Sequence, residues 1–133
     1  MDLVVNGHNH VYERTDAIKG GRVSKKVPIG ETVDSTREGI VYVTAGGAGK
    51  SLYDFPVPDS YEGHVKDLDH VDTYHWAKGR EKVKETVQWS RVRYTGYSFI
   101  AVEVLPGHRP RMKVTALAES GESVDRFEVT RRR

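Results

Sequence analysis

The sequence predicts a β-rich domain whose strands are mostly antiparallel. Short runs rich in Val, Ile, Tyr and Thr recur along the chain, and clusters of Gly, Pro, Asn and Ser separate them. The last third alternates apolar with polar residues, which is the period of a half-buried strand. The chain has 133 residues, so these strands fit one modest domain.

Strands are expected at residues 3–5, 39–44, 97–105, 111–118 and 124–131. The polar segment Glu119-Ser120-Gly121-Glu122 predicts a turn between the last two strands, and therefore an antiparallel hairpin. Residues 15–38 carry paired glycines and a lone proline, and we interpret them as loop with one short hairpin at most. Residues 59–93 show no clean period, so we expect an irregular surface excursion there.

Composition excludes several classes of function. The formal net charge is +2, which is too small to predict a nucleic-acid partner. No run approaches the roughly 20 apolar residues that span a bilayer, so no membrane partner is expected. The chain has no cysteine, which excludes disulfides, thiolate metal sites and cysteine nucleophiles. Metal ligands, if any, must come from His, Asp, Glu, Asn or Tyr.

The segment with the clearest chemistry is Asn6-Gly7-His8-Asn9-His10, directly after the first expected strand. Gly7 permits a sharp turn. An extended backbone from His8 to His10 would point both imidazoles to the same side, where they could serve one metal ion or two adjacent ions. Two histidines in this spacing also occur as ordinary structural residues, and the spacing alone leaves both interpretations open.

Three segments together resemble the purple acid phosphatases, a group of calcineurin-like metallophosphoesterases. The run VVNGHNHVYERT (4–15) resembles the family's last metal-binding motif, a GHxH followed by an aromatic-Glu-Arg segment. GIVYVTAGGAG (39–49) resembles the strand and glycine loop that come next. GYSF (96–99) opens a β run that resembles the family's closing strands. The matches follow the family's order and cover most of the chain, and residues 61–89 resemble it least.

The resemblance implies that residues 1–133 form the C-terminal portion of a metallophosphoesterase domain. Its fold would be α/β, a four-layer α-β-β-α sandwich to which this chain contributes strands. The family hydrolyses phosphate esters with a hydroxide that a dinuclear metal centre activates. By resemblance, His8 would bind one ion and His10 the other, in a parent protein that holds two divalent or trivalent ions of the Fe, Zn or Mn type. No catalytic residue is implied beyond these ligands.

The remaining motif residues are expected to support the ligands instead of binding metal. Residues that would brace the loop or orient the histidines are Asn6, Gly7, Tyr12, Glu13 and Arg14. A nearby glycine loop would let the backbone pack close to the metal site; its glycines are Gly46, Gly47 and Gly49.

The family's other ligand motifs, DxH or DxG, GDxxx(D/Y), GNH(D/E) and a further His, do not occur in this sequence. We therefore expect the isolated chain to be inactive and to bind metal weakly or not at all. Met1 is followed at once by a strand-like run, which suggests a part of a longer chain. Members of the family are often secreted, but nothing in the sequence assigns a compartment.

One alternative competes with this interpretation at the level of the whole chain. The histidines could be structural, and the chain a non-catalytic β-rich binding or interaction module. In either case the first strand would expose an edge, and exposed edges pair with other chains. We therefore expect a homodimer or a strand-swapped assembly.

Two further patterns are weaker. The sequence GGAGKS (46–51) is similar to a phosphate-binding P-loop, but Thr44 stands where that motif needs glycine, and the prolines that follow disfavour a helix. A loose cluster of acids and histidines could form an accessory metal site, although a solvated loop is the better interpretation. Its members are His64, Asp67, Asp69, His70, Asp72 and His75.

Overall fold

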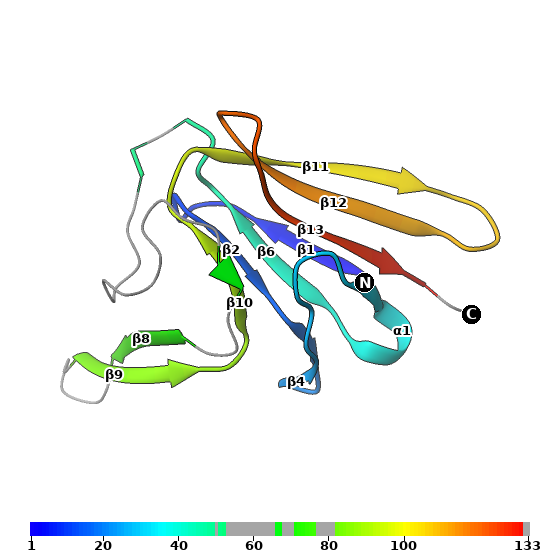
Figure 1. The fold of residues 1–133 in the computed structure, drawn as a ribbon. Coiled ribbons are helices and arrows are strands. Elements are labelled where there is room, and N and C mark those ends of the chain that lie inside the picture. The colour runs from blue at the N-terminus through cyan, green and yellow to red at the C-terminus, as the bar shows by residue number, and fades with distance from the viewer. Residues whose placement is uncertain (50, 53–65, 68–70, 77–81, 132–133) are drawn as a thin grey trace.

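The computed structural model describes residues 1–49, 51–52, 66–67, 71–76 and 82–131, with the backbone alone at 66–67, 71–76 and 82. Over these residues the chain is β-rich, and most of its strands form two larger sheets that pack face to face (Figure 1). The predicted β-rich class is therefore confirmed. The pairing is mostly antiparallel, as expected, with one parallel pair in each of the two larger sheets.

The first sheet has five strands in the order β1-β6-β2-β10-β7. Their bounds are β1 Leu3–Asn6, β6 Val41–Ala45, β2 Tyr12–Thr15, β10 Ser90–Tyr94 and β7 Lys66–Asp67. β1 runs parallel to β6, and the other neighbours are antiparallel. Because β1 and β6 run the same way, the loops that follow them emerge at the same end of the sheet.

The second sheet has four strands in the order β11-β12-β13-β5. Their bounds are β11 Ser98–Leu105, β12 Arg111–Ala118, β13 Ser123–Thr130 and β5 Thr32–Asp34. The three long strands agree with the expected ranges to within one residue, and β12 and β13 form the predicted antiparallel hairpin. In this part of the sequence apolar and polar residues alternate clearly enough to predict both the positions of the strands and the faces that they turn inward.

The middle of the chain is more regular than the sequence suggested. Two small hairpins lie outside the main sheets, β3 Ala17–Lys19 with β4 Arg22–Lys25, and β8 Val71–Trp76 with β9 Lys82–Val87. A short helix, α1 Ser35–Glu38, follows β5. The interpretation of 15–38 as loop is wrong for β5, which belongs to the second sheet. In the part of the chain that the structure describes, no helix is long and apolar enough to cross a membrane.

The expected irregular excursion over 59–93 is wrong at its C-terminal end. β10 lies inside the first sheet, and Ser90, Arg91, Val92 and Arg93 are all buried. A strand with two buried arginines shows no apolar alternation, because ion pairs instead of apolar contacts bury its side chains. The sequence period therefore could not reveal this strand.

The apolar core lies between the two sheets. The first sheet and its adjoining segments contribute Tyr12, Ala17, Val27, Val41, Val43 and Val92; the second contributes Val33, Val114, Ala116, Ala118, Val124, Phe127 and Val129. These side chains are small apart from the two aromatic rings. Most of the stabilisation from apolar burial in the described chain comes from this layer.

A buried polar cluster, Tyr12, Arg14 and Asp125, joins the two sheets through this core. Arg14 donates Nε to Asp125 Oδ2 at 2.8 Å and Nη2 to Oδ1 at 2.9 Å, and both side chains are completely buried. The hydroxyl of Tyr12 donates to Asp125 Oδ2 at 2.5 Å. Arg14 also donates to the carbonyl of Val27 and lies over the ring of Phe127, 5.0 Å from its centroid. We call this cluster the Asp125 clamp, because it fixes β2 against β13.

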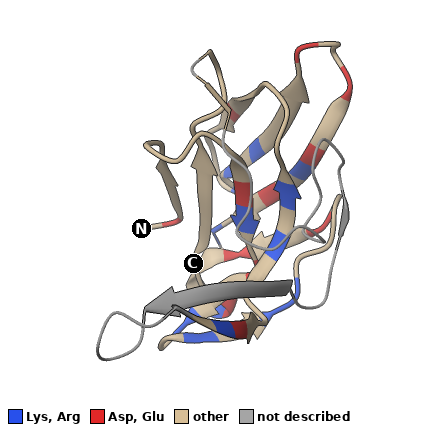
Figure 2. Ribbon diagram, turned by 90° about the vertical axis from the view of Figure 1, so that its left-hand side faces the viewer, with Lys and Arg blue, Asp and Glu red and all other residues tan. Residues whose placement is uncertain are grey.

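Two more ion pairs connect β10 to Glu13 on β2 and to Asp16, which follows β2. Arg91 Nε and Nη2 donate to the two oxygens of Asp16 at 2.7 and 2.8 Å. Arg93 Nε donates to Glu13 Oε2 at 2.9 Å, and Ser90 Oγ donates to the same oxygen at 2.6 Å. Acidic and basic residues are interspersed along the described strands and do not gather on faces of one sign (Figure 2).

The clamp predicts a loss of stability at alkaline pH. Burial, and next the Asp125 carboxylate, raise the pKa of Tyr12 well above its ordinary value of 10.0. The unfolded tyrosine ionises at about pH 10 while the folded one stays protonated, so this stability is complete below about pH 10 and is lost as pH rises toward the folded pKa. Urea unfolding from about pH 8 to about pH 11 should show a decline approaching 1.4 kcal/mol per pH unit from this group.

The variant Tyr12→Phe isolates this contribution. It should be less stable by about 1 kcal/mol at neutral pH, because the Asp125 hydrogen bond is lost, and its alkaline decline should be shallower. Tyr42→Phe changes a tyrosine that is 38% exposed on β6 and serves as the matched control. An alkaline slope equal in Tyr12→Phe and in the unmodified chain would contradict the assignment.

The outer edge of β1 predicts self-association. Among the strands that the structure describes, β1 pairs with β6 alone, and Val5 on this strand is 46% exposed. Unpaired strand edges pair with other chains, so light scattering should give a mass above 15.0 kDa that rises with concentration. Val5→Lys should lower that mass. Val104→Lys, on the edge strand β11 of the other sheet, is the control that tests whether the effect is specific to β1. A monomeric mass that does not change with concentration would refute the prediction of self-association.

Candidate functional site

The candidate site is the histidine loop, residues 7–11, which connects β1 to β2. In the sheet order β6 lies between these two strands, so the loop crosses over the end of β6. Asn6 is paired with Thr44 in the parallel register, and Thr44 Oγ1 donates to Asn6 Oδ1 at 2.9 Å. The loop therefore starts and ends on strands fixed to the same central strand. Ligands commonly bind beyond the carboxyl ends of parallel strands.

The backbone of the histidine loop is tightly turned and not extended as expected. His8 has φ of 77°, the single positive φ of a non-glycine residue in the described chain. The amide of Asn9 donates to the carbonyl of Gly7 at 3.0 Å, and the amide of Val11 donates to that of Asn9 at 2.9 Å. These are two successive γ-turns, centred on His8 and His10. The turn with positive φ at its centre is rare and strained, and strain of this kind clusters at functional sites.

The ring of His10 is oriented by a backbone carbonyl. Its Nδ1 lies 2.5 Å from the oxygen of Ser51, and because a carbonyl can only accept, Nδ1 must carry the proton. This tautomer leaves the lone pair on Nε2. A donated Nδ1 proton and a ligating Nε2 are the usual arrangement of metal-binding histidines. His10 is half-buried and His8 is exposed.

The glycine loop, residues 46–49, lies directly against the histidine loop. The amide of Gly46 donates to the carbonyl of Val11 at 3.2 Å. A Cβ at Gly46 would collide with the backbone carbonyl of Asn9, whereas a Cβ at Gly49 would meet nothing within 4 Å. Gly47 accepts a hydrogen bond from the amide of Ser98 at 3.1 Å. Only glycine at position 46 allows the two loops this close approach.

The other motif residues point into the sandwich or along the sheet. Tyr12 and Arg14 belong to the Asp125 clamp, and Glu13 holds Arg93 and Ser90. Asn6 contacts Thr44, as described above. Gly7 has open space around it, and its φ is not positive, so its place in the loop does not require glycine.

The described residues do not complete a metal centre. Within the described chain no group of three or more His, Asp or Glu side chains is placed to hold an ion. The histidine loop supplies two imidazoles, which is too few ligands for a dinuclear centre. The acid-and-histidine cluster of 64–75, suggested by the sequence, lies outside the residues whose side chains are described, as does Lys50 of the P-loop-like segment.

Two partners of the motif residues were missed by sequence reasoning. Asp125 could have been found, because it shares the inward parity of Phe127 and Val129 on a predicted strand, and an inward-facing acid needs a cation. Ser51 carries no such signal. It acts through its backbone carbonyl, and it lies 41 positions from His10.

Comparison with known proteins places the fold. No family model matches the chain. Two proteins of Mycobacterium tuberculosis, uncharacterized protein MT2654 of strain CDC 1551 / Oshkosh and uncharacterized protein Rv2577 of strain ATCC 25618 / H37Rv, are each 31% identical over 153 aligned positions. The alignments cover all of this chain and 28% of each relative, so the chain spans about a quarter of their length.

A solved structure is similar over nearly the whole chain. The purple acid phosphatase PPD1 from yellow lupin (Lupinus luteus) seeds matches 98% of this chain and 18% of its own, with a TM-score of 0.63 and 22% identity. At that identity the likeness establishes the fold. The two-sheet arrangement described here is therefore similar to a β-rich portion of a metallophosphoesterase fold.

The contact between the two loops predicts a pair of contrasting glycine variants. Gly46→Ala should lower the free energy of unfolding by about 1–3 kcal/mol, because the added methyl forces the histidine loop away. Gly49→Ala, in open space, should change it by less than about 0.5 kcal/mol. Thermal and urea unfolding measure both. The contact is disproved if the two variants are equally stable.

Proposed function

We propose that this chain is the histidine-bearing portion of a metal-dependent phosphoesterase that hydrolyses phosphate esters. In this proposal His8 and His10 each bind one ion of a metal pair. Such a pair supplies an activated water and neutralises charge on the phosphoryl oxygens. The chain's own part is to hold the two imidazoles at the end of β1 and to set their orientation.

The observation that carries the proposal is the strained histidine loop together with the orientation of His10. A positive φ at His8 costs free energy, of order 1–3 kcal/mol, and backbone strain of this kind clusters at functional sites. The hydrogen bond from Nδ1 of His10 to the Ser51 carbonyl places the proton on Nδ1 and the ring lone pair on Nε2, which is the usual arrangement of a metal-binding histidine. The likeness of the fold to a purple acid phosphatase supports the same assignment.

The isolated chain should be inactive in this proposal. Two imidazoles hold an ion weakly, and the remaining ligands of a dinuclear centre have to come from residues other than those described here. The curated relatives are several times longer than the region they share with this chain. Activity, and the Fe, Zn or Mn type of metal pair, are therefore assigned to a longer parent protein.

The first experiment compares the metal affinity of the chain with that of His8→Ala/His10→Ala. Zn²⁺ or Mn²⁺ is titrated at fixed pH, and bound metal is measured by elemental analysis after equilibrium dialysis. We expect weak, sub-stoichiometric binding that falls at least about tenfold in the double variant. His108→Ala, at an exposed histidine outside the loop, is the matched control and should bind as the unmodified chain does.

Equal metal in all three proteins would overturn the ligand assignment and favour the alternative, a non-catalytic β-rich module with structural histidines. Hydrolysis of p-nitrophenyl phosphate is measured in the same samples. Robust turnover by the isolated chain would refute the inference that it lacks necessary ligands. Absence of turnover together with histidine-dependent metal binding is the expected combination.

A further inference from the structure

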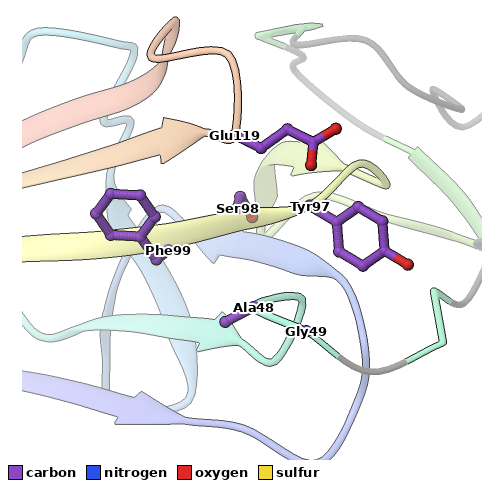
Figure 3. A pocket seen from close by; sticks show the side chains of 6 residues that line it. All are labelled: Ala48, Gly49, Tyr97, Ser98, Phe99 and Glu119. Carbon is purple, nitrogen blue, oxygen red and sulfur yellow. The ribbon is translucent and has the colours of Figure 1, made fainter.

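A second feature lies beside the histidine loop and is not used by the metal ligands. It is a hollow of about 560 Å³ at the start of β11. Its lining residues are Ala48, Gly49, Tyr97, Ser98, Phe99 and Glu119 (Figure 3). A volume of this order matches pockets for small organic molecules, roughly 300–1,000 Å³.

Two aromatic rings form one wall of the hollow. Tyr97 directly precedes β11 and Phe99 is the second residue of this strand, and both side chains line the hollow (Figure 3). Tyr97 is 39% exposed and Phe99 is 50% exposed. Ser98, between them, points the other way and is buried. Exposed rings in a concave place offer faces on which a planar group can stack.

The charge of the described lining disfavours the phosphate itself as the occupant of the hollow. Among the lining residues that the structure describes Glu119 is charged, and none is Lys or Arg. The amide of Glu119 donates to the carbonyl of Tyr97 at 3.1 Å, which holds the acid next to the rings. A carboxylate repels a phosphate and accepts hydrogen bonds from N–H and O–H groups. The hollow therefore suits an uncharged planar group that carries such a donor.

The hollow is connected to the histidine loop through residues 46–49 and 51–52, which the structure describes. On one side this segment contacts the histidine loop, where Gly46 binds the Val11 carbonyl and Ser51 holds His10. On the other side Gly47 binds the amide of Ser98, and Ala48 and Gly49 line the hollow. A molecule that spans this segment would have one end at His10 and the other against the aromatic rings.

We infer that the hollow binds the alcohol part of the phosphate ester, a planar aromatic group with a hydrogen-bond donor, such as a nucleoside or a phenol. This inference rests on the proposed function, since it assigns to the same site the class of ester it prefers. The two rings stack on the aromatic group, and Glu119 accepts its N–H or O–H hydrogen. The ester's phosphate then lies on the side of the histidine loop.

The test uses ligands without phosphate, so it needs neither metal nor catalysis. The isotope-labelled chain is titrated with adenosine in one arm and with phenol in the other, and amide shifts at Tyr97, Phe99 and Glu119 are followed by NMR. Saturable shifts at these residues are expected in at least one arm, and the stronger arm distinguishes a nucleoside from a simple aryl group. Ribose alone, which lacks a ring to stack, should give no shift.

Variants make the test specific. Phe99→Leu keeps the apolar volume but removes a stacking face, and binding should weaken about tenfold. Phe99→Tyr keeps an aromatic ring at this position and should bind the ligand as the unmodified chain does. Trp89→Leu is the matched control, because Trp89 is 40% exposed but precedes β10 and does not line the hollow. Glu119→Gln should lower the affinity for a ligand that carries an N–H or O–H donor by a few fold, and should leave the affinity for benzene unchanged.

The outcomes separate this inference from the proposed function. Binding that survives in His8→Ala/His10→Ala, while metal binding is lost, supports the hollow as an independent subsite. No saturable shift in either arm overturns the inference and leaves the metal experiment standing. Equal weakening by Phe99→Leu and Trp89→Leu also overturns it, because stacking would then be non-specific.

Discussion

The arginine–aspartate pair at the centre of the sandwich determines how the two sheets lie on each other. Arg14 and Asp125 have no contact with solvent, and a buried guanidinium or carboxylate is stable only where its partner is correctly placed. With both oxygens of Asp125 bonded to Arg14, and Tyr12 on one of them, β2 and β13 have one permitted relative position. A shift of either strand by one residue would turn Arg14 or Asp125 away from its partner. The remaining charged side chain would then be buried in the apolar core without a partner.

This constraint extends directly to the histidine loop. Tyr12 belongs to the clamp and follows Val11, the last residue of the loop, so the loop's exit is fixed to the core. Its entry is fixed by β1, which pairs with β6 in parallel. Between these two anchors the loop has few residues with which to cross the end of β6, and the tight turn at His8 with positive φ is the result. Gly46 provides the space that this crossing needs beneath Asn9.

How much the sequence reveals depends on what buries each strand. β11, β12 and β13 alternate apolar and polar residues, and this pattern predicted their bounds and their hairpin. β10 is buried by ion pairs, so its Arg91 and Arg93 suggested an exposed segment although both lie inside the sheet. β5 has three residues, too few to show any period.

The candidate site divides in the same way. The spacing of His8 and His10 and the flanking motif are local, and the sequence displays them directly. The contact with the Ser51 carbonyl, and the turned backbone that replaced the expected extended one, come from the crossing over β6 and from no local pattern. The parity of Asp125 on a predicted strand was a usable sign of the clamp. For the hollow beside Phe99, the sequence showed the glycine loop and the GYSF segment separately, but no local pattern indicated that they lie against each other.

The position of β1 at the rim of its sheet has a consequence for energetics. Terminal strands open locally at a lower free energy than the core, and β1 is one of the two arms that hold the histidine loop in its strained shape. When β1 frays, the strain at His8 is released while β2 stays anchored by the clamp. Under the proposed function, ions bound to the two imidazoles would favour the closed form, and by reciprocity anything that pairs with the outer edge of β1 would raise the affinity for those ions. Edge pairing and metal binding would then be thermodynamically linked.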